Sequence, residues 1–259
     1  MKTDLPMQIR FRPNQLLLCP LCVLFLGCAD AATPLEYELV QTYAHNEGNF
    51  TQGLTFHEGK LYEGTGQYGD SRLIIYRDDF ETPAVTRALA NRYFGEGITV
   101  HQDLLYQLTW KSGTAFSFGP EDLSRTGSFS YEGEGWGITS GNERLWISNG
   151  GTDLIQLSNE GELINQLAVT LDDKPLNFLN ELEWIDGSIY ANRWYDNNIY
   201  RIDPDSGEVT GVINLELIAL AHQSDRNKVL NGIAWNPERQ TLWVTGKYWN
   251  EIYELRLID

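Results

Sequence analysis

Five stretches of the chain repeat one pattern of hydrophobic and polar positions. Each copy has an apolar-rich run, a short polar turn such as HEGK at residues 57–60, and a second run rich in β-forming residues. This pattern is typical of a β-hairpin. Further β-rich segments follow in each copy, so every repeat has room for the four strands of a β-propeller blade. The copies begin 44, 40, 44 and 51 residues apart, at Gln52, Glu96, Trp136, Asn180 and Asn231.

The two ends of this repeat array complement each other. The last copy ends one strand short, after residues 252–257, whereas residues 37–43 form a surplus β-rich segment ahead of the first copy. A ring of blades closes without an exposed edge if the first segment completes the last blade. The pattern therefore predicts an all-β, five-bladed propeller in one domain over residues 34–259, with a single short helix near residues 215–222.

The first 33 residues differ from the rest and resemble an export signal. Basic residues within positions 2–12 precede an apolar run over residues 16–26, which is too short to span a bilayer and matches a signal-peptide core. The segment LFLGC at residues 24–28 resembles a lipobox in which Cys28 carries the lipid, and ordinary cleavage near Ala31–Ala32 is the alternative. We therefore expect a periplasmic or outer-membrane lipoprotein of a bacterium, or a secreted protein.

Composition and charge exclude several classes of function. The chain has 36 acidic and 19 basic residues, a net charge of −17, and such a surface repels phosphate backbones, so we expect no nucleic-acid partner. The four histidines lack the spacing of a zinc site, and all three cysteines lie in the leader. The sequence contains no nucleophile elbow and no Walker loop. We expect a monomer without a metal or other cofactor.

Two sets of equivalent repeat positions predict a site on one face of the ring. The first set begins each inner strand, and the second ends the following strand, which lies beside it in an antiparallel hairpin. Together they bring one carboxylate, one ammonium, three amides and three tryptophans to one rim, as a small-ligand pocket requires. The alternative is that the tryptophans pack between blades while Glu96 forms a structural ion pair with Lys247. The second set consists of Gly66, Trp110, Gly150, Trp194 and Lys247.

The motifs at these positions resemble those of the glutamine cyclotransferases of plants and bacteria. They are FTQG at 50–53, YFGEG at 93–97, GWG at 135–137, LNELE at 179–183, ANRW at 191–194, LNGIAW at 230–235 and VTGK at 244–247. The resemblance covers residues 36–259 and implies a five-bladed propeller that converts N-terminal glutaminyl residues of peptides or proteins into pyroglutamyl residues, releasing ammonia. It implies that Glu96 is the acid/base residue. The pocket that it implies is formed by Phe50, Gln52, Phe94, Trp110, Trp136, Asn180, Trp194 and Lys247, with Asn231 and Glu181 as secondary candidates.

These residue types suit the chemistry of that reaction. One carboxylate can accept a proton from the attacking amine and donate one to the departing nitrogen, while aromatic walls hold the substrate in a folded conformer. Burial would raise the pKa of Glu96 and Lys247 would lower it, and the sequence leaves the balance open. Gln52, Asn180 and Lys247 are all candidates to stabilise the amide oxygen.

Two other functions stay open at this point. Glu96, Asn180 and Asn231 offer the oxygen ligands that calcium takes in lactonase-like propellers, although only one of them is charged. A ligand-binding propeller without catalysis is the third possibility. Activity with and without a chelator separates the three.

Overall fold

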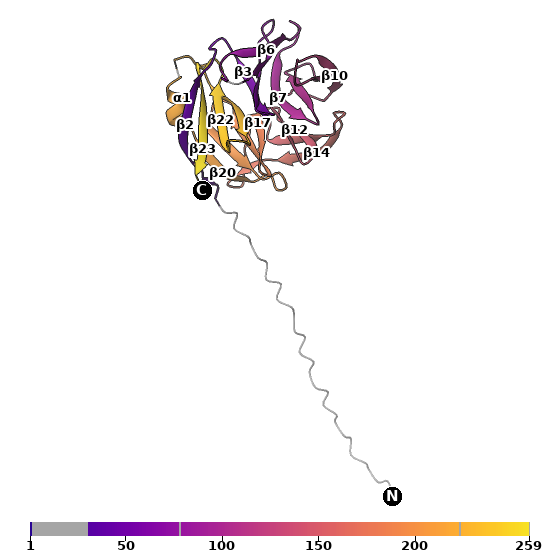
Figure 1. Cartoon of the computed structure of the whole chain (residues 1–259). Coiled ribbons are helices and arrows are strands. Elements are labelled where there is room, and N and C mark those ends of the chain that lie inside the picture. Colours follow the sequence, from indigo (N-terminus) through magenta and orange to yellow (C-terminus); the bar gives the residue numbers. More distant parts are fainter. Residues whose placement is uncertain (2–30, 78, 223, 259) are drawn as a thin grey trace.

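Five sheets of four or five strands surround one axis, and each of them is a blade of the ring (Figure 1). The computed structural model describes Met1 and residues 31–77, 79–222 and 224–258. Cys28 and the rest of the lipobox lie outside the described residues. The inner strands β3, β7, β11, β17 and β21 contact one another in that order, and β21 contacts β3, so the ring is closed.

Within each blade, strands that follow one another along the chain are neighbours, and the first of them lies innermost. The first blade comprises β3 (Thr51–His57), β4 (Lys60–Thr65), β5 (Arg72–Tyr76) and β6 (Pro83–Ala88). The second comprises β7 (Gly95–His101), β8 (Leu104–Thr109), β9 (Thr114–Phe118) and β10 (Arg125–Ser130). The third comprises β11 (Ile138–Gly141), β12 (Arg144–Ile147), β13 (Asp153–Leu157) and β14 (Leu163–Ala168). The fourth comprises β17 (Leu179–Ile185), β18 (Ser188–Arg193), β19 (Asn198–Ile202) and β20 (Val209–Asn214), with β1 (Thr33–Pro34) added at its outer edge. The fifth comprises β21 (Leu230–Asn236), β22 (Thr241–Gly246) and β23 (Glu251–Ile258), with β2 (Glu36–Ala44) as its outer strand.

The predicted hairpins are confirmed, and the backbone of their turns explains the polar sequences found there. In the first four blades, both central residues of the inner turn have positive φ, from 45° to 82°. Two-residue turns of this kind match the twist of the flanking strands and favour Asn, Asp and Gly. The pairs are Glu58–Gly59, Gln102–Asp103, Asn142–Glu143 and Asp186–Gly187.

The first long strand closes the ring, as the repeat pattern predicts. Strand β2 pairs antiparallel with β23, from Glu36 opposite Ile258 to Ala44 opposite Glu251. Tyr43 of β2 stacks on Trp243 of β22 with ring centroids 4.4 Å apart. The N-terminal strand therefore supplies both the outer hydrogen-bonding partner and part of the core of the last blade.

One pairing was not anticipated. Strand β1 pairs parallel with β20, with Thr33 opposite Gly211, although the sequence analysis placed Thr33 ahead of the propeller domain. Leu35 then packs against the core between the fourth and fifth blades. Strand β2 begins on the face of the ring opposite the end of β22, because β23 runs away from that end and β2 runs back toward it.

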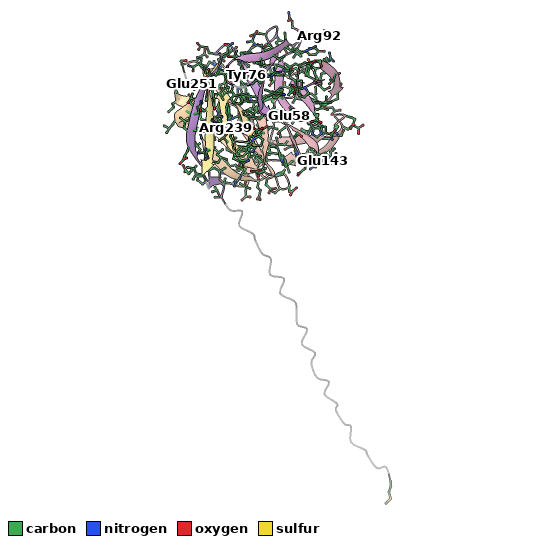
Figure 2. All side chains as sticks on the ribbon, viewed as in Figure 1. Glu58, Tyr76, Arg92, Glu143, Arg239 and Glu251 are labelled. Atoms are coloured by element: carbon green, nitrogen blue, oxygen red, sulfur yellow. The ribbon has the colours of Figure 1, made fainter. Side chains whose placement is uncertain are left out.

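The remaining elements are short. The predicted helix is present as α1 (Glu216–Leu220), and β15 (Thr170–Leu171) pairs with β16 (Lys174–Pro175). No helix within the described residues has the length and hydropathy needed to cross a bilayer. Side chains fill the space between the ribbons, with Arg92 and Glu143 at the periphery (Figure 2). The apolar core lies between adjacent blades, where side chains such as Leu54, Ile98 and Leu182 are fully buried.

Candidate active site

A β-bulge marks the start of the inner strand in four of the five blades. In β7, Gly95 pairs with Thr109 and Ile98 with Gln107, so the first strand has one extra residue. The same irregularity occurs in β3, β17 and β21. A bulge re-aims the side chains that it contains. It thereby breaks the strand alternation at the positions of Gln52, Glu96, Asn180 and Asn231.

These bulges and the ends of the second strands surround one cavity of about 250 Å³. The cavity brings together all nine residues that the resemblance implied for the acid/base and the substrate pocket. Their roles stay predictions. The nine are Phe50, Gln52, Phe94, Glu96, Trp110, Trp136, Asn180, Trp194 and Lys247.

Two glycines make room for the aromatic walls. A Cβ at Gly66 would lie 2.5 Å from the ring of Phe94, and one at Gly150 would lie 2.6 Å from the ring of Trp136. These glycines hold the repeat positions that Trp110 and Trp194 occupy in the neighbouring blades. Large and small residues therefore alternate around the rim, which lets the rings pack edge to face, as Trp136 and Trp194 do at 5.6 Å.

Glu96 and Lys247 are the two buried charged groups of the cavity, with 4% and 5% of their surface exposed. No ion pair of 4.0 Å or less joins them among the described residues. The Nζ atom of Lys247 lies over the ring of Phe50, 4.8 Å from its centroid. The structural ion pair considered from the sequence is therefore not formed as a direct contact.

Burial decides the electrostatics of the Glu96 carboxyl. Burial raises its pKa well above 4.5, the positive charge of Lys247 opposes this rise, and the negative charge of Glu134 adds to it. Burial likewise lowers the pKa of Lys247 to about 8, against the attraction of Glu96. A carboxyl group with a raised pKa can hold and release a proton near neutral pH, as an acid/base residue must.

The comparisons with known proteins agree with this geometry. A family model described as glutamine cyclotransferase matches residues 18–257. The glutaminyl-peptide cyclotransferase of Arabidopsis thaliana is 33% identical over 230 residues, which cover 86% of this chain and 71% of the plant protein. The crystal structure of Myxococcus xanthus glutaminyl cyclase superposes with a TM-score of 0.82 at 34% identity, covering 88% of this chain and 100% of that one. The chain belongs to the glutamine cyclotransferase family.

Two secondary candidates of this cyclotransferase do not line the cavity. Asn231 lies behind it, where its Nδ2 donates to the carbonyl of Thr51 at 2.9 Å and to Oε1 of Gln52 at 3.3 Å. Glu181 is fully buried and accepts the backbone N–H groups of Leu54 and Ile233 at 3.2 and 2.8 Å. Neither residue is among those that line the cavity, and their roles as secondary candidates stay predictions. Each residue supports the inner strands.

The position of Glu181 explains its burial. It occupies the site after the lead residue, where the other four blades have Gly53, Gly97, Gly137 and Gly232. Its carboxylate therefore reaches from the fourth blade to backbone of the first and the fifth. Burial, and after it the charge of Glu183, raises the pKa of the Glu181 carboxyl well above 4.5. Through its two hydrogen bonds, Glu181 of the fourth blade joins the inner strands of the first and fifth blades.

The cavity of the cyclotransferase also contains residues that the repeat did not single out. Gln67 and Tyr195 each follow the end of a second strand, and both have positive φ, 88° and 60°. The sequence signal that could have identified them is their position immediately after Gly66 and Trp194, which belong to the second set of repeat positions. Arg226, Asn227 and Val229 come from the segment before β21, which has no counterpart in the repeat.

The calcium-site hypothesis lacks a suitable group of ligands in the described part of the chain. No cluster of three or more His, Cys, Asp or Glu side chains is present there. Asn231 faces Gln52 rather than the cavity, so only two of the three proposed calcium ligands, Glu96 and Asn180, share it. Membership of the cyclotransferase family favours cyclisation over the lactonase-like and non-catalytic alternatives.

Proposed function

We propose that this chain is a glutaminyl-peptide cyclotransferase in which Glu96 is the acid/base residue. The observation that carries the proposal is a single buried carboxyl with a raised pKa in an aromatic cavity of the glutamine cyclotransferase family. The substrate is a peptide or protein with N-terminal glutamine, and the products are its pyroglutamyl form and ammonia. The reaction uses protein side chains alone and needs no cofactor.

The aromatic walls supply the orientation that the reaction needs. The α-amine must reach the side-chain carbonyl of the same residue, so rotation about the side-chain torsions has to be restricted. Trp110, Trp136 and Trp194 enclose the cavity and favour such a folded conformer. Fixing reacting groups of one molecule in an attack geometry contributes strongly to rate.

One proton passes through Glu96 in each turnover. The neutral α-amine attacks the carboxamide carbon, and the new C–N bond places a proton in excess on the attacking nitrogen. Glu96 accepts that proton and delivers it to the departing nitrogen, the old C–N bond breaks, and ammonia leaves. The carboxyl ends in the state in which it began, so the atoms and charges balance without a co-reactant.

Two amides that line the cavity, those of Gln52 and Asn180, are our candidates to donate to the developing oxyanion. Oε1 of Gln52 accepts a hydrogen bond from Asn231, so Nε2 is the atom of this amide that we expect to donate. Oδ1 of Asn180 is buried, so Nδ2 is the atom of this amide that we expect to donate. We assign the oxyanion to these two N–H donors, with Lys247 adding positive charge.

The direct test is ammonia release from a Gln-initiated dipeptide amide by the purified protein. We expect release from the Gln peptide, none from the matched Asn peptide, and no loss of activity after incubation with EDTA or 1,10-phenanthroline. Absence of release from the Gln peptide contradicts the proposed function. Activity that is lost with a chelator and restored by adding calcium or zinc contradicts the cofactor-free mechanism.

We further propose that the protein is exported and tethered as a monomer through lipidated Cys28. The LFLGC segment after a basic and apolar leader supports this proposal. Because β2 begins on the face opposite the cavity, a tether on that side leaves the cavity facing away from the membrane. We expect the wild-type protein to partition into detergent and the C28S variant to be soluble. An unmodified mature N-terminus at residue 32 or 33 excludes the tether.

A further inference from the structure

Glu134 is a charged residue beside the cavity that takes no part in the proposed proton transfer, although its charge adds to the raised pKa of Glu96. It belongs to the segment GEGWG at residues 133–137, between β10 and β11. Its side chain does not line the cavity. It accepts hydrogen bonds from two residues that do.

One oxygen of Glu134 connects two walls of the cavity. Oε2 accepts the indole N–H of Trp110 at 2.7 Å and that of Trp136 at 3.0 Å. Trp110 follows β8 in the second blade and Trp136 precedes β11 in the third. The carboxylate thus fixes the angle between indoles that come from different blades.

The charge environment strengthens this arrangement. An indole N–H can only donate, so both tryptophans need an acceptor, and an ionised acceptor forms the stronger bond. Nζ of Lys111 lies 3.9 Å from Oε1 of Glu134. The same ammonium lies 3.9 Å from the centroid of the Trp110 ring. Lys111 and Glu134 therefore contact Trp110, a wall of the cavity, and each other.

We propose that Glu134 is a positioning residue that locks the indoles of Trp110 and Trp136 into the shape that folds the glutaminyl side chain for cyclisation. The inference rests on the proposed cyclotransferase activity and extends it to a residue that never touches the substrate. Without Glu134, both indoles lose their shared acceptor and can rotate away from the substrate. The substrate then binds more weakly and spends less time in the attack conformer.

Three variants test this role. E134A removes the acceptor, E134Q keeps an acceptor oxygen without the charge, and E132Q removes one charge from an exposed residue in the same loop. We expect E134A to raise KM and lower kcat, so that kcat/KM for a Gln dipeptide amide falls by about tenfold or more. E134Q should recover at least about a third of the wild-type kcat/KM, and E132Q should match wild type. All three should melt cooperatively.

The outcomes distinguish this inference from the activity on which it rests. If wild type releases no ammonia, the proposed function fails. If wild type is active and E134A stays within about twofold of E132Q, Glu134 does not position the walls. Equal losses in E134A and E134Q also overturn the proposal, because an acceptor oxygen would then not suffice. A loss in E134A that E134Q restores supports it.

Discussion

Nδ2 of Asn231 donates a hydrogen bond to Oε1 of Gln52 at 3.3 Å, so a residue behind the cavity contacts one that lines it. In the proposed mechanism this contact leaves Nε2 of Gln52 as the donor to the oxyanion. The repeat position of Asn231 indicated its importance but not the direction of its side chain.

Replacing Asn231 therefore should affect catalysis through Gln52. We expect N231A to lower kcat about tenfold and to reduce stability by about 1–3 kcal/mol, since it leaves buried acceptors unpaired. N231D should be worse, because an ionised carboxylate would face the oxygens of Thr51 and Gln52. Steady-state kinetics measure the change in kcat of both variants, and urea unfolding measures their loss of stability. An N231A enzyme with unchanged kcat shows that the orientation of Gln52 does not matter.

Ring closure by β2 can be tested at one side chain. Tyr43 stacks on Trp243, and its hydroxyl donates to Oε2 of Glu254 at 3.0 Å. Y43A should lower the free energy of unfolding by about 3–5 kcal/mol. Its control, L39A, changes a residue of the same strand that is 54% exposed, and it should cost at most about 0.5 kcal/mol. Similar urea midpoints for the two variants contradict the closure account.

A buried network beside this closure predicts a pH dependence of stability. Nε2 of His45 lies 3.1 Å from Oε1 of Glu63. Burial alone would lower the pKa of His45, but the charge and hydrogen bond of Glu63 outweigh it and raise that pKa above 6.5. Burial alone would raise the pKa of Glu63, but His45 and the hydroxyls of Thr51 and Tyr76 outweigh it and lower that pKa below 4.5.

The signs of these shifts define a pH window. The contribution of His45 is complete below pH 6.5 and is lost as pH rises through its folded pKa. That of Glu63 is complete above pH 4.5 and is lost as pH falls through its folded pKa. Unfolding at several pH values should show the largest difference between wild type and E63Q between pH 4.5 and 6.5, about 3 kcal/mol or more. A difference that is constant with pH rules out the coupling.

Lys247 should set the position of one limb of the pH–rate profile. Its charge lowers the pKa of Glu96 against the larger effect of burial. Removing that charge in K247M therefore raises the pKa of Glu96 further, and the limb controlled by Glu96 moves to higher pH. The control is K60M. Lys60 begins β4, at the end of that strand away from the cavity, and its charge is paired with Glu121. Profiles of kcat/KM that coincide for K247M and wild type contradict the assignment.

The sequence predicted the fold well because the fold repeats. Five copies of one hairpin pattern and a complementary N-terminal strand leave few ways to arrange the blades. The nine cavity residues could also be predicted from the sequence, since equivalent repeat positions converge on one face and the resemblance identified the residues there.

The directions of individual side chains could not be predicted in the same way. Asn231 and Glu181 lie in β-bulges, where strand alternation no longer tells which face a side chain takes. Arg226 comes from a segment between blades, outside the repeat. Glu134 was hidden in a glycine-rich motif whose importance depends on two indole groups that only the folded ring brings together.

Stability should respond to Glu96 in the opposite sense from activity. Because burial raises its pKa, the ionised form is disfavoured in the folded state, so the carboxylate costs stability at pH values above its unfolded pKa. E96Q should therefore unfold at an equal or higher urea concentration than wild type at pH 8. A marked destabilisation would indicate a structural role instead.

The most direct test of the account is the kcat of E96Q on a Gln dipeptide amide. Glutamine keeps the shape of the side chain but cannot accept or donate the proton that the mechanism passes through Glu96. We predict that kcat falls by about 100-fold or more while KM stays nearly unchanged. A variant that keeps more than about a third of the wild-type kcat contradicts the role of Glu96 as the acid/base residue.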